Sequence, residues 1–343
     1  MTRSINGASV IVTGSSGFIG SHLCTRLVED LGCRVVGIDY MPPKFDLEGG
    51  KSTASSTASS TASSSSNSKP FKESGSKERF SFQLTDISNS SQIKNIYSKC
   101  DTIDYIFHLA ALANPRACKA DFDLAFAVNV LGAKNVIVES PKESRIVFMS
   151  SAAVYGPMPT TIPIPENHLR NGTDPYAITK IMGEDLCNCY VENYGYNICI
   201  GRNFNAFGEG QVTDYIIPTL IKQAVMSSSI EVWNTNPVRD FLYVEDTIDA
   251  LITLAEHGER GRKYNIGSGK GRSIGELINL VKKIVSDDIQ VRDLKRQVIG
   301  SNKLIADASS LKGLGWSPKI DLEEGLRRTI DWFKSQKTLL ATK

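Results

Sequence analysis

The sequence of 343 residues lacks both long apolar runs and an excess of charge of one sign. Roughly 18 consecutive apolar residues are needed to cross a bilayer, so no membrane association is expected. The 39 Lys and Arg residues are balanced by 37 Asp and Glu residues, which leaves a formal net charge of +2. Nucleic acids attract proteins through strongly basic surfaces, so no nucleic-acid partner is expected either.

Disulfide and metal-site patterns are also missing. The seven cysteines are odd in number and show no framework spacing, and the four histidines lie far apart along the chain. These features predict reduced thiols and no bound metal. A secretory signal is not apparent, because the segment ASVIVTG, which begins at Ala8, already has the pattern of a buried strand. We therefore expect a cytoplasmic protein.

The first half of the chain alternates short apolar runs with helical patterns. The predicted strands are Ser9–Thr13, Arg34–Asp39, Phe80–Leu84, Tyr105–His108 and Arg145–Ser150, and the predicted helices are Phe18–Leu31, Ser90–Lys99 and Asp121–Ser140. Near-continuous apolar strands between helices are typical of a parallel sheet that is covered on both faces. The expected class is therefore α/β, with a Rossmann-type doubly wound sheet.

The second half has a more broken pattern. Its predicted strands are Asn197–Arg202, Phe241–Val244 and Lys263–Ile266, and its predicted helices are Tyr215–Met226, Asp246–Glu256, Ile274–Val285 and Leu322–Lys337. This indicates a smaller α/β domain that is interleaved with the end of the first sheet. Residues 1–203 would mainly form the first domain and residues 204–343 the second.

One segment has a different composition. From Ser52 the chain reads STAS three times and then SSSSNSK. Such residues offer little surface to bury and cannot offset their ordering entropy. We predict a disordered surface insertion at residues 49–77; a phosphorylated or partner-binding segment is the alternative.

A glycine-rich loop lies between the first predicted strand and the first predicted helix. In VIVTGSSGFIGSHL, the glycines Gly14, Gly17 and Gly20 are three residues apart. In a strand–loop–helix context they permit a tight turn, close approach of a pyrophosphate and close helix packing. Asp39 ends the next strand, where an acid binds a ribose 2′-OH and favours NAD over NADP. Lys44, nearby, could weaken that preference, and the alternative is a set of turn glycines beside a surface aspartate.

The segment DPYAITK places a tyrosine four residues before a lysine, at a predicted helix start. Pro175 fits a first helical turn, and positions i and i+4 share a face, so Tyr176 and Lys180 should lie side by side. A cation beside a phenol lowers the phenol pKa and favours a general base. The alternative is a tyrosine that packs on a lysine stem.

Eight motifs in order carry a family resemblance: GSSGFIG, TDI, HLAAL, MSSAAVYG, DPYAITK, GRNFNAFG, VRDFLYVED and YNIGSG. Along the whole chain except the serine-rich tract, the sequence resembles the extended short-chain dehydrogenase/reductases. Within them it is similar to the NAD-dependent nucleotide-sugar epimerases and dehydratases, and most like the UDP-glucose/UDP-galactose 4-epimerase type.

This resemblance implies roles for individual residues. Tyr176 matches the catalytic base, Lys180 the lysine that binds the nicotinamide ribose, and Ser151 the residue that hydrogen-bonds the reacting sugar hydroxyl. The implied NAD-binding residues are Gly14, Gly17, Phe18, Ile19, Gly20, Asp39, Asp86, Ile87, Leu109, Ala110, Ala111, Tyr176 and Lys180. The implied residues for a nucleotide-diphosphate sugar are Ser151, Asn205, Arg239 and Arg296. A homodimer through 121–140 and 176–194 is also implied.

The motif MSSAAVYG bears on the reaction type. The related dehydratases carry an acid and a base after the serine, where this chain has Ala152 and Ala153. Alanine cannot transfer a proton, so the resemblance favours a 4-epimerase. A 4-keto reductase or a dehydratase-like enzyme stays open, as does a non-catalytic NAD-binding scaffold. Gly300 stands where the family often has a nucleotide-binding aspartate, so the nucleotide and the sugar also stay open.

Overall fold

The computed structural model describes residues 4–43, 79–157, 162–227, 229–296 and 303–341. The predicted insertion at 49–77, together with Lys44 and Gly300, lies outside these ranges. The chain divides into two compact units. The first consists of Met1–Met149, Met182–Cys199 and Ala255–Arg262, and the second of Ser150–Ile181, Ile200–Leu254 and Lys263–Lys343.

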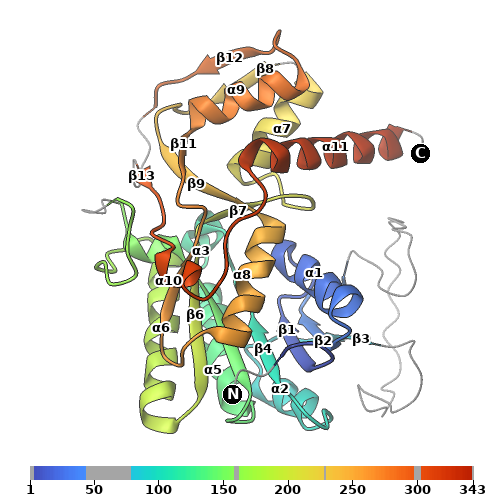
Figure 1. The fold of residues 1–343 in the computed structure, drawn as a ribbon, viewed down its shortest axis with the longest axis vertical. Coiled ribbons are helices and arrows are strands. Elements are labelled where there is room, and N and C mark those ends of the chain that lie inside the picture. Colours follow the sequence, from blue (N-terminus) through green and yellow to red (C-terminus); the bar gives the residue numbers. More distant parts are fainter. Residues whose placement is uncertain (1–3, 44–78, 158–161, 228, 297–302, 342–343) are drawn as a thin grey trace. The chain divides into compact units, whose positions relative to one another are not determined.

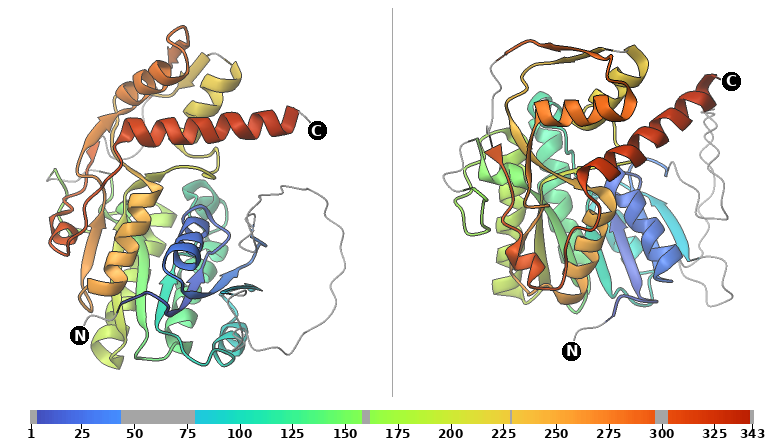
Figure 2. Two further views of the ribbon diagram at one scale, coloured as in Figure 1. Left: turned by 45° about the vertical axis from the view of Figure 1, so that its right-hand side comes forward. Right: turned by 45° about the horizontal axis from the view of Figure 1, so that its top comes forward.

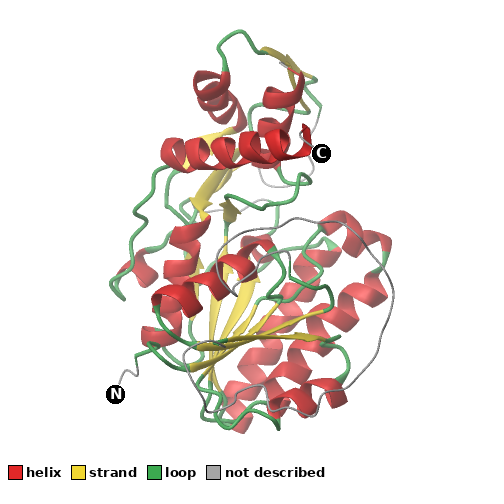
Figure 3. Ribbon diagram, turned by 90° about the vertical axis from the view of Figure 1, so that its right-hand side faces the viewer, coloured by secondary structure: helices red, strands yellow, loops and turns green. Residues whose placement is uncertain are grey.

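A seven-stranded parallel sheet has the order β10-β6-β5-β4-β1-β2-β3 (Figures 1 and 3). Its strands are β1 (Ser9–Thr13), β2 (Arg34–Asp39), β3 (Phe80–Leu84), β4 (Tyr105–His108), β5 (Arg145–Ser151), β6 (Asn197–Asn203) and β10 (Lys263–Ile266). The strand order reverses between β1 and β4. Open α/β sheets bind ligands at such a switch point, beyond the carboxyl ends of the strands.

Helices flank this sheet, as the alternating pattern predicts. Those that begin in the first unit are α1 (Phe18–Thr25), η1 (Arg26–Asp30), α2 (Ser90–Tyr97), α3 (Pro115–Ala120), α4 (Phe122–Phe126), η2 (Ala127–Leu131) and α5 (Gly132–Glu139). The predicted helix 121–140 is therefore three consecutive segments, with a π-helical stretch in the middle. The first-unit core is made of apolar strand and helix residues such as Val12, Leu23, Val36 and Phe107.

The second unit contains smaller sheets and additional helices (Figure 2). Its short strands are β7 (Asn205–Phe207), β8 (Ser229–Val232), β9 (Val238–Tyr243), β11 (Gly271–Ser273), β12 (Gln290–Asp293) and β13 (Lys303–Leu304). The helices that begin in it include η3 (Ala152–Tyr155), α7 (Ile216–Ser227), α8 (Val244–His257), α9 (Ile274–Val285), α10 (Ser309–Lys312) and α11 (Leu322–Ala341). Strand β9 pairs with β7, β11 and β13, while β8 pairs with β12.

Helix α9 illustrates how sequence fixes a local boundary in this unit. Ser273 and Glu276 form a reciprocal capping box at its start. Ile274, Leu277 and Val281 follow at helical spacing and are buried. Helix α6 (Pro175–Tyr194) starts at the proline of DPYAITK and runs from the second unit into the first. Within the described ranges, no helix combines the length and apolarity that a membrane crossing requires.

Candidate active site

The glycine loop of the first unit is a tight turn that leads directly into the start of helix α1. Gly14 has a φ of 75°, and a Cβ atom on it would lie 2.7 Å from the backbone nitrogen of Ala110. A Cβ on Gly20 would overlap the Gly14 carbonyl oxygen. Gly17 caps α1 without a side-chain hydrogen bond, and Phe18 and Ile19 form the first turn. Such a bare helix N-terminus fits the pyrophosphate of a dinucleotide.

Asp39 lies beside this loop, at the carboxyl end of β2. Its carboxylate accepts hydrogen bonds from the backbone N–H groups of Ser16, at 3.0 Å, and Met41, at 3.1 Å. Burial raises the pKa of Asp39 above its ordinary value, and these hydrogen bonds partly oppose the rise. The carboxylate is thus fixed next to the loop, as the prediction for a ribose-binding acid requires.

The other implied cofactor residues follow β3 and β4. Asp86 is exposed, while Ile87 is buried and its carbonyl accepts from Asn135 Nδ2 at 3.1 Å. Leu109 donates to the carbonyl of Thr13 at 3.2 Å, so the segment 109–111 starts alongside the end of β1. The first unit therefore gathers these side chains at the carboxyl ends of β1, β2, β3 and β4, around the switch point.

The close approach of Ser15 and Gly37 in this unit was not predicted from the sequence. The hydroxyl of Ser15 is fully buried and has no hydrogen-bond partner among the described residues. It occupies space beside Gly37 of β2, where an added Cβ would lie 2.7 Å from Ser15 Oγ. The glycine on β2 thus accommodates the serine of the loop, a relation between distant positions that no local motif signals.

The second unit holds the predicted catalytic residues. Lys180 Nζ lies 5.9 Å from the centroid of the Tyr176 ring, which confirms that the two side chains share a face of α6. Lys180 is only 5% exposed. Asp174 accepts from the Ala177 N–H at 3.1 Å and so stabilises the start of the helix. Ser151 ends β5, and its hydroxyl oxygen accepts from the Ala153 N–H at 3.1 Å.

Backbone packing joins the turn after Ser151 to the segment before Tyr176. The Gly172 N–H donates to the carbonyl of Val154 at 3.0 Å. A Cβ on Gly172 would lie 2.6 Å from both the Ala153 oxygen and the Ala177 Cβ. Only a glycine allows the backbone at position 172 to come this close to Ala153 and Ala177. Gly172 therefore helps to determine where η3 lies against the first turn of α6.

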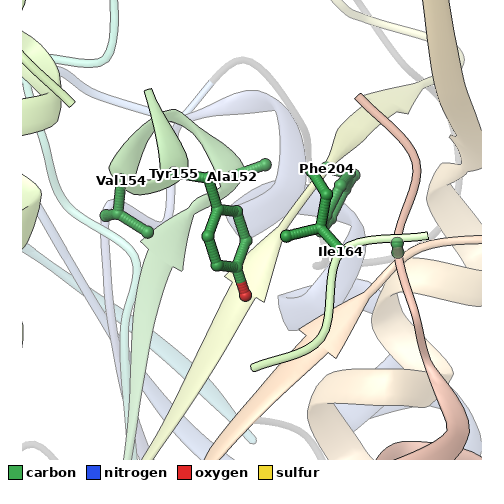
Figure 4. Close-up of a cluster of buried hydrophobic side chains, with 6 residues drawn as sticks. Ala152, Val154, Tyr155, Ile164 and Phe204 are labelled. Carbon is green, nitrogen blue, oxygen red and sulfur yellow. The ribbon is translucent and has the colours of Figure 1, made fainter. Parts of the chain in front are cut away.

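The turn after Ser151 is part of a buried cluster of apolar side chains. The cluster contains Ala152, Val154, Tyr155, Ile164 and Phe204, which Figure 4 labels. Tyr155 donates its hydroxyl to Asn265 Oδ1 at 2.5 Å and accepts from Arg202 Nη1 at 3.0 Å. Burial raises the pKa of Tyr155 to about 12, so its phenol stays protonated and is unsuited to act as a base near neutral pH.

The implied substrate residues also lie in the second unit. Asn205 Nδ2 on β7 donates to the carbonyl of Asp240 at 3.0 Å. The strand register places Asn205 opposite Phe241 of β9, two residues after Arg239. Burial lowers the pKa of the Arg239 guanidinium. Arg296 lies on the β8–β12 side, where its Cζ is 5.9 Å from the ring centroid of Trp233. Trp233 is 53% exposed, and its aromatic ring is a signal that the sequence reasoning overlooked.

The described residues show no cluster of His, Cys, Asp and Glu side chains suited to a metal ion. A family model described as the NAD dependent epimerase/dehydratase family matches residues 10–267. The chain belongs to this family. The match runs from the second residue of β1 to the residue after β10 and so includes the loop, Asp39, Ser151, Tyr176 and Lys180.

Individual relatives span nearly the whole chain. A putative UDP-glucose 4-epimerase of Methanocaldococcus jannaschii is 30% identical over 339 residues, covering 95% of this chain and 98% of the relative. A dTDP-D-glucose 4,6-dehydratase of Bos taurus is 27% identical over 352 residues, covering 95% and 88%. A UDP-glucuronic acid 4-epimerase from Bacillus cereus, solved with UDP-glucuronic acid and NAD, has a TM-score of 0.79 at 27% identity, covering 96% and 99%.

Membership makes the chain an enzyme of the NAD-dependent epimerase/dehydratase family, with NAD as its cofactor. The residues of the first unit fit that cofactor. The positions of Gly14 and Gly20 cannot hold a side chain, the start of α1 has no side-chain cap, and Asp39 offers a carboxylate where a 2′-phosphate would be repelled.

Proposed function

We propose that the protein is an NAD-dependent 4-epimerase of a nucleotide-diphosphate sugar. The observation that carries the proposal is the combination of Ser151, Tyr176 and Lys180 with Ala152 and Ala153. The first three suffice for oxidation and reduction at one carbon, and the two alanines offer no group that transfers a proton. The 4-epimerases among the similar proteins support this choice, while the dehydratases among them define the alternative.

In the proposed mechanism, Tyr176 takes the proton of the sugar 4-OH. The neighbouring Lys180 cation favours the phenolate, because it stabilises the charged form. Ser151 already accepts a hydrogen bond from the Ala153 N–H, so its own O–H is left to donate to the sugar oxygen. When bound, NAD⁺ would supply the acceptor for the hydride that leaves the sugar C4, and its reduced form the donor that returns it. Tyr176 then returns the proton to the opposite epimer.

Epimerisation also requires that the 4-keto sugar turns over without leaving. Arg239 and Asn205 are proposed to hold the diphosphate, which does not react. In the described part of the chain, the Arg239 side chain has one hydrogen-bond partner, the Val238 carbonyl at 2.9 Å. A half-buried guanidinium whose loss of hydration is offset by only this hydrogen bond is suited to bind an anion. The exposed ring of Trp233 would support the base, with Arg296 beside it.

The test is to incubate the purified protein with UDP-glucose, UDP-N-acetylglucosamine, UDP-glucuronate and their GDP and dTDP counterparts. Proton NMR would follow the sugar signals with no added reductant. Conversion of one sugar to its C4 epimer, lost in Tyr176→Phe while NAD stays bound, is the expected result. Consumption of NADH only with a 4-keto sugar would indicate a reductase instead. NAD binding with no turnover of any sugar would indicate a scaffold.

The proposed assembly is a cytoplasmic homodimer. The segments that the resemblance assigns to the interface carry exposed apolar side chains, all within the first unit: Phe122, Leu124, Leu131, Met182 and Tyr194. Large exposed apolar patches commonly mark interfaces. Light scattering on the purified protein should give twice the chain mass, and Leu131→Glu should shift it toward the monomer.

A further inference from the structure

Two arginines are direct cross-strand neighbours in the small sheet of the second unit. Strand β11 pairs antiparallel with β9, and the register places Arg272 opposite Arg239. Opposed residues of paired strands project from the same face, a few ångströms apart at Cβ. Like charges in this position destabilise the sheet, and a negative charge bound between them would relieve the repulsion.

The acidic residue next to Arg239 does not supply that charge. Asp240 follows Arg239 in the strand, so its side chain projects from the opposite face. There it is fully buried and accepts from the N–H groups of Ser268, at 2.8 Å, Gly269, at 2.9 Å, and Ala306, at 3.1 Å. Its carboxylate is committed to the backbone of these loops.

Arg272 has an acidic partner, but the contact is weak. Its Nη1 lies 3.4 Å from Glu276 Oε1, and both side chains are about half exposed. The other oxygen of Glu276 is held by the Ser273 N–H at 2.8 Å, in the capping box of α9. An exposed pair at this distance contributes little to stability and exchanges readily.

The β8–β12 ribbon of the same unit provides a contrast. There the register places Arg292 opposite Glu231, and the two side chains form an ion pair at 3.0 Å. One exposed arginine therefore meets a cross-strand acid, whereas Arg272 meets a second, half-buried cation.

We infer that Arg272 is a second diphosphate-binding residue, which exchanges Glu276 for one phosphoryl group while Arg239 binds the other. A diphosphate carries two negatively charged groups on adjacent phosphorus atoms, so it matches two neighbouring guanidinium groups better than a monophosphate does. The inference rests on the proposed function, because it takes Arg239 as part of the nucleotide-sugar site.

Calorimetric titration with UDP, UMP and uridine tests the inference without turnover. Arg272→Gln should bind UDP about tenfold or more weakly, because it loses a charge-assisted contact. Its affinity for UMP should fall by less, and its affinity for uridine should not change. Arg292→Gln, which removes an exposed arginine from the other ribbon, should bind all three like the wild type. In turnover, Arg272→Gln should raise KM and leave kcat nearly unchanged.

Glu276→Gln gives an independent result of opposite sign. Glutamine can also complete a capping box, so α9 is retained. Removing the acid that competes for Arg272 should strengthen UDP binding several-fold. Unchanged UDP affinity in Arg272→Gln, or weaker UDP binding in Glu276→Gln, would overturn the inference and leave the epimerase proposal standing. Failure of the wild type to bind any nucleoside diphosphate would instead count against the proposed function.

Discussion

Lys180 holds its ammonium 5.9 Å from the centre of the Tyr176 ring, one turn further along α6. The lysine is almost completely buried, so its charge is poorly screened by solvent. A tyrosine base near neutral pH depends on that charge, because an isolated phenol titrates near about 10.

Replacing Lys180 by methionine keeps the length of the side chain and removes the charge. The proposed epimerase activity at pH 7 should fall about 100-fold or more, and it should recover as the pH rises toward about 10, because the phenolate fraction then increases. A pH profile of kcat/KM measures this effect. Lys142→Met is the matched control, because Lys142 Nζ also lies over a tyrosine ring, 5.8 Å from the centroid of Tyr196. A flat profile in Lys180→Met would contradict the role.

The carboxylate of Asp39 predicts a pH-dependent choice of cofactor. Burial raises its pKa, so it takes up a proton at a higher pH than an ordinary aspartate. NAD binding that needs the ionised form should be complete well above this raised pKa and should weaken as the pH falls through it. Asp39→Asn should bind NAD about tenfold more weakly, bind NADP more tightly and lose the pH dependence. Fluorescence titrations from pH 4 to 8 would measure the NAD affinity, the NADP affinity and the pH dependence of each. If the wild type and Asp39→Asn bound NADP equally weakly, the charge of Asp39 would not be the cause of the cofactor preference.

Ser15 should be replaceable with a gain in stability. Ser15→Ala removes a buried hydroxyl without a partner, so the protein should become more stable by about 1 kcal/mol. Gly37→Ala should destabilise it by about 1–3 kcal/mol, because the new methyl group meets Ser15 Oγ. Thermal unfolding of both variants and of the double variant measures the coupling. Strictly additive effects would show that the two positions do not share the space described.

Gly172 should affect activity more than stability. Gly172→Ala pushes the turn after Ser151 away from the first turn of α6, so kcat should fall at least about tenfold while NAD still binds. The matched control is Gly275→Ala, because a Cβ there meets its nearest neighbour, on Thr235, at an ordinary 3.5 Å. Equal kcat values in the two variants would argue against a positioning role.

Strong local patterns made much of the fold predictable. Strands β1 to β4 and β10 have the predicted bounds, and α6 starts at Pro175, because buried parallel strands are continuous apolar runs and proline favours a first helical turn. The short strands β7, β8, β11, β12 and β13 were not predicted, since two to four residues are too few to establish an alternating pattern. Strand β9 begins at Val238 rather than Phe241, because the charged residues Arg239 and Asp240 interrupt the apolar run although they pair within the sheet.

The candidate site also has a part that was predictable from local motifs and a part that was not. The glycine loop and the Tyr176–Lys180 pair are local motifs, and their geometry agrees with the spacing. The contacts of Ser15 with Gly37, and of Arg239 with Arg272, depend on which strands pair across tens of residues, and no local pattern encodes that pairing. The functional roles given to the site residues stay predictions.

The division of the chain has a consequence for synthesis on the ribosome. The polypeptide passes between the two units five times, and the last part of the first unit is Ala255–Arg262. The backbone of Ile5, near the start of the chain, is bonded to the carboxylate of Glu256 at 3.0 Å. Domains commonly fold from the N-terminal end during translation. Here the first unit cannot close until residue 262 has emerged, so its exposed strands need protection from aggregation through most of translation.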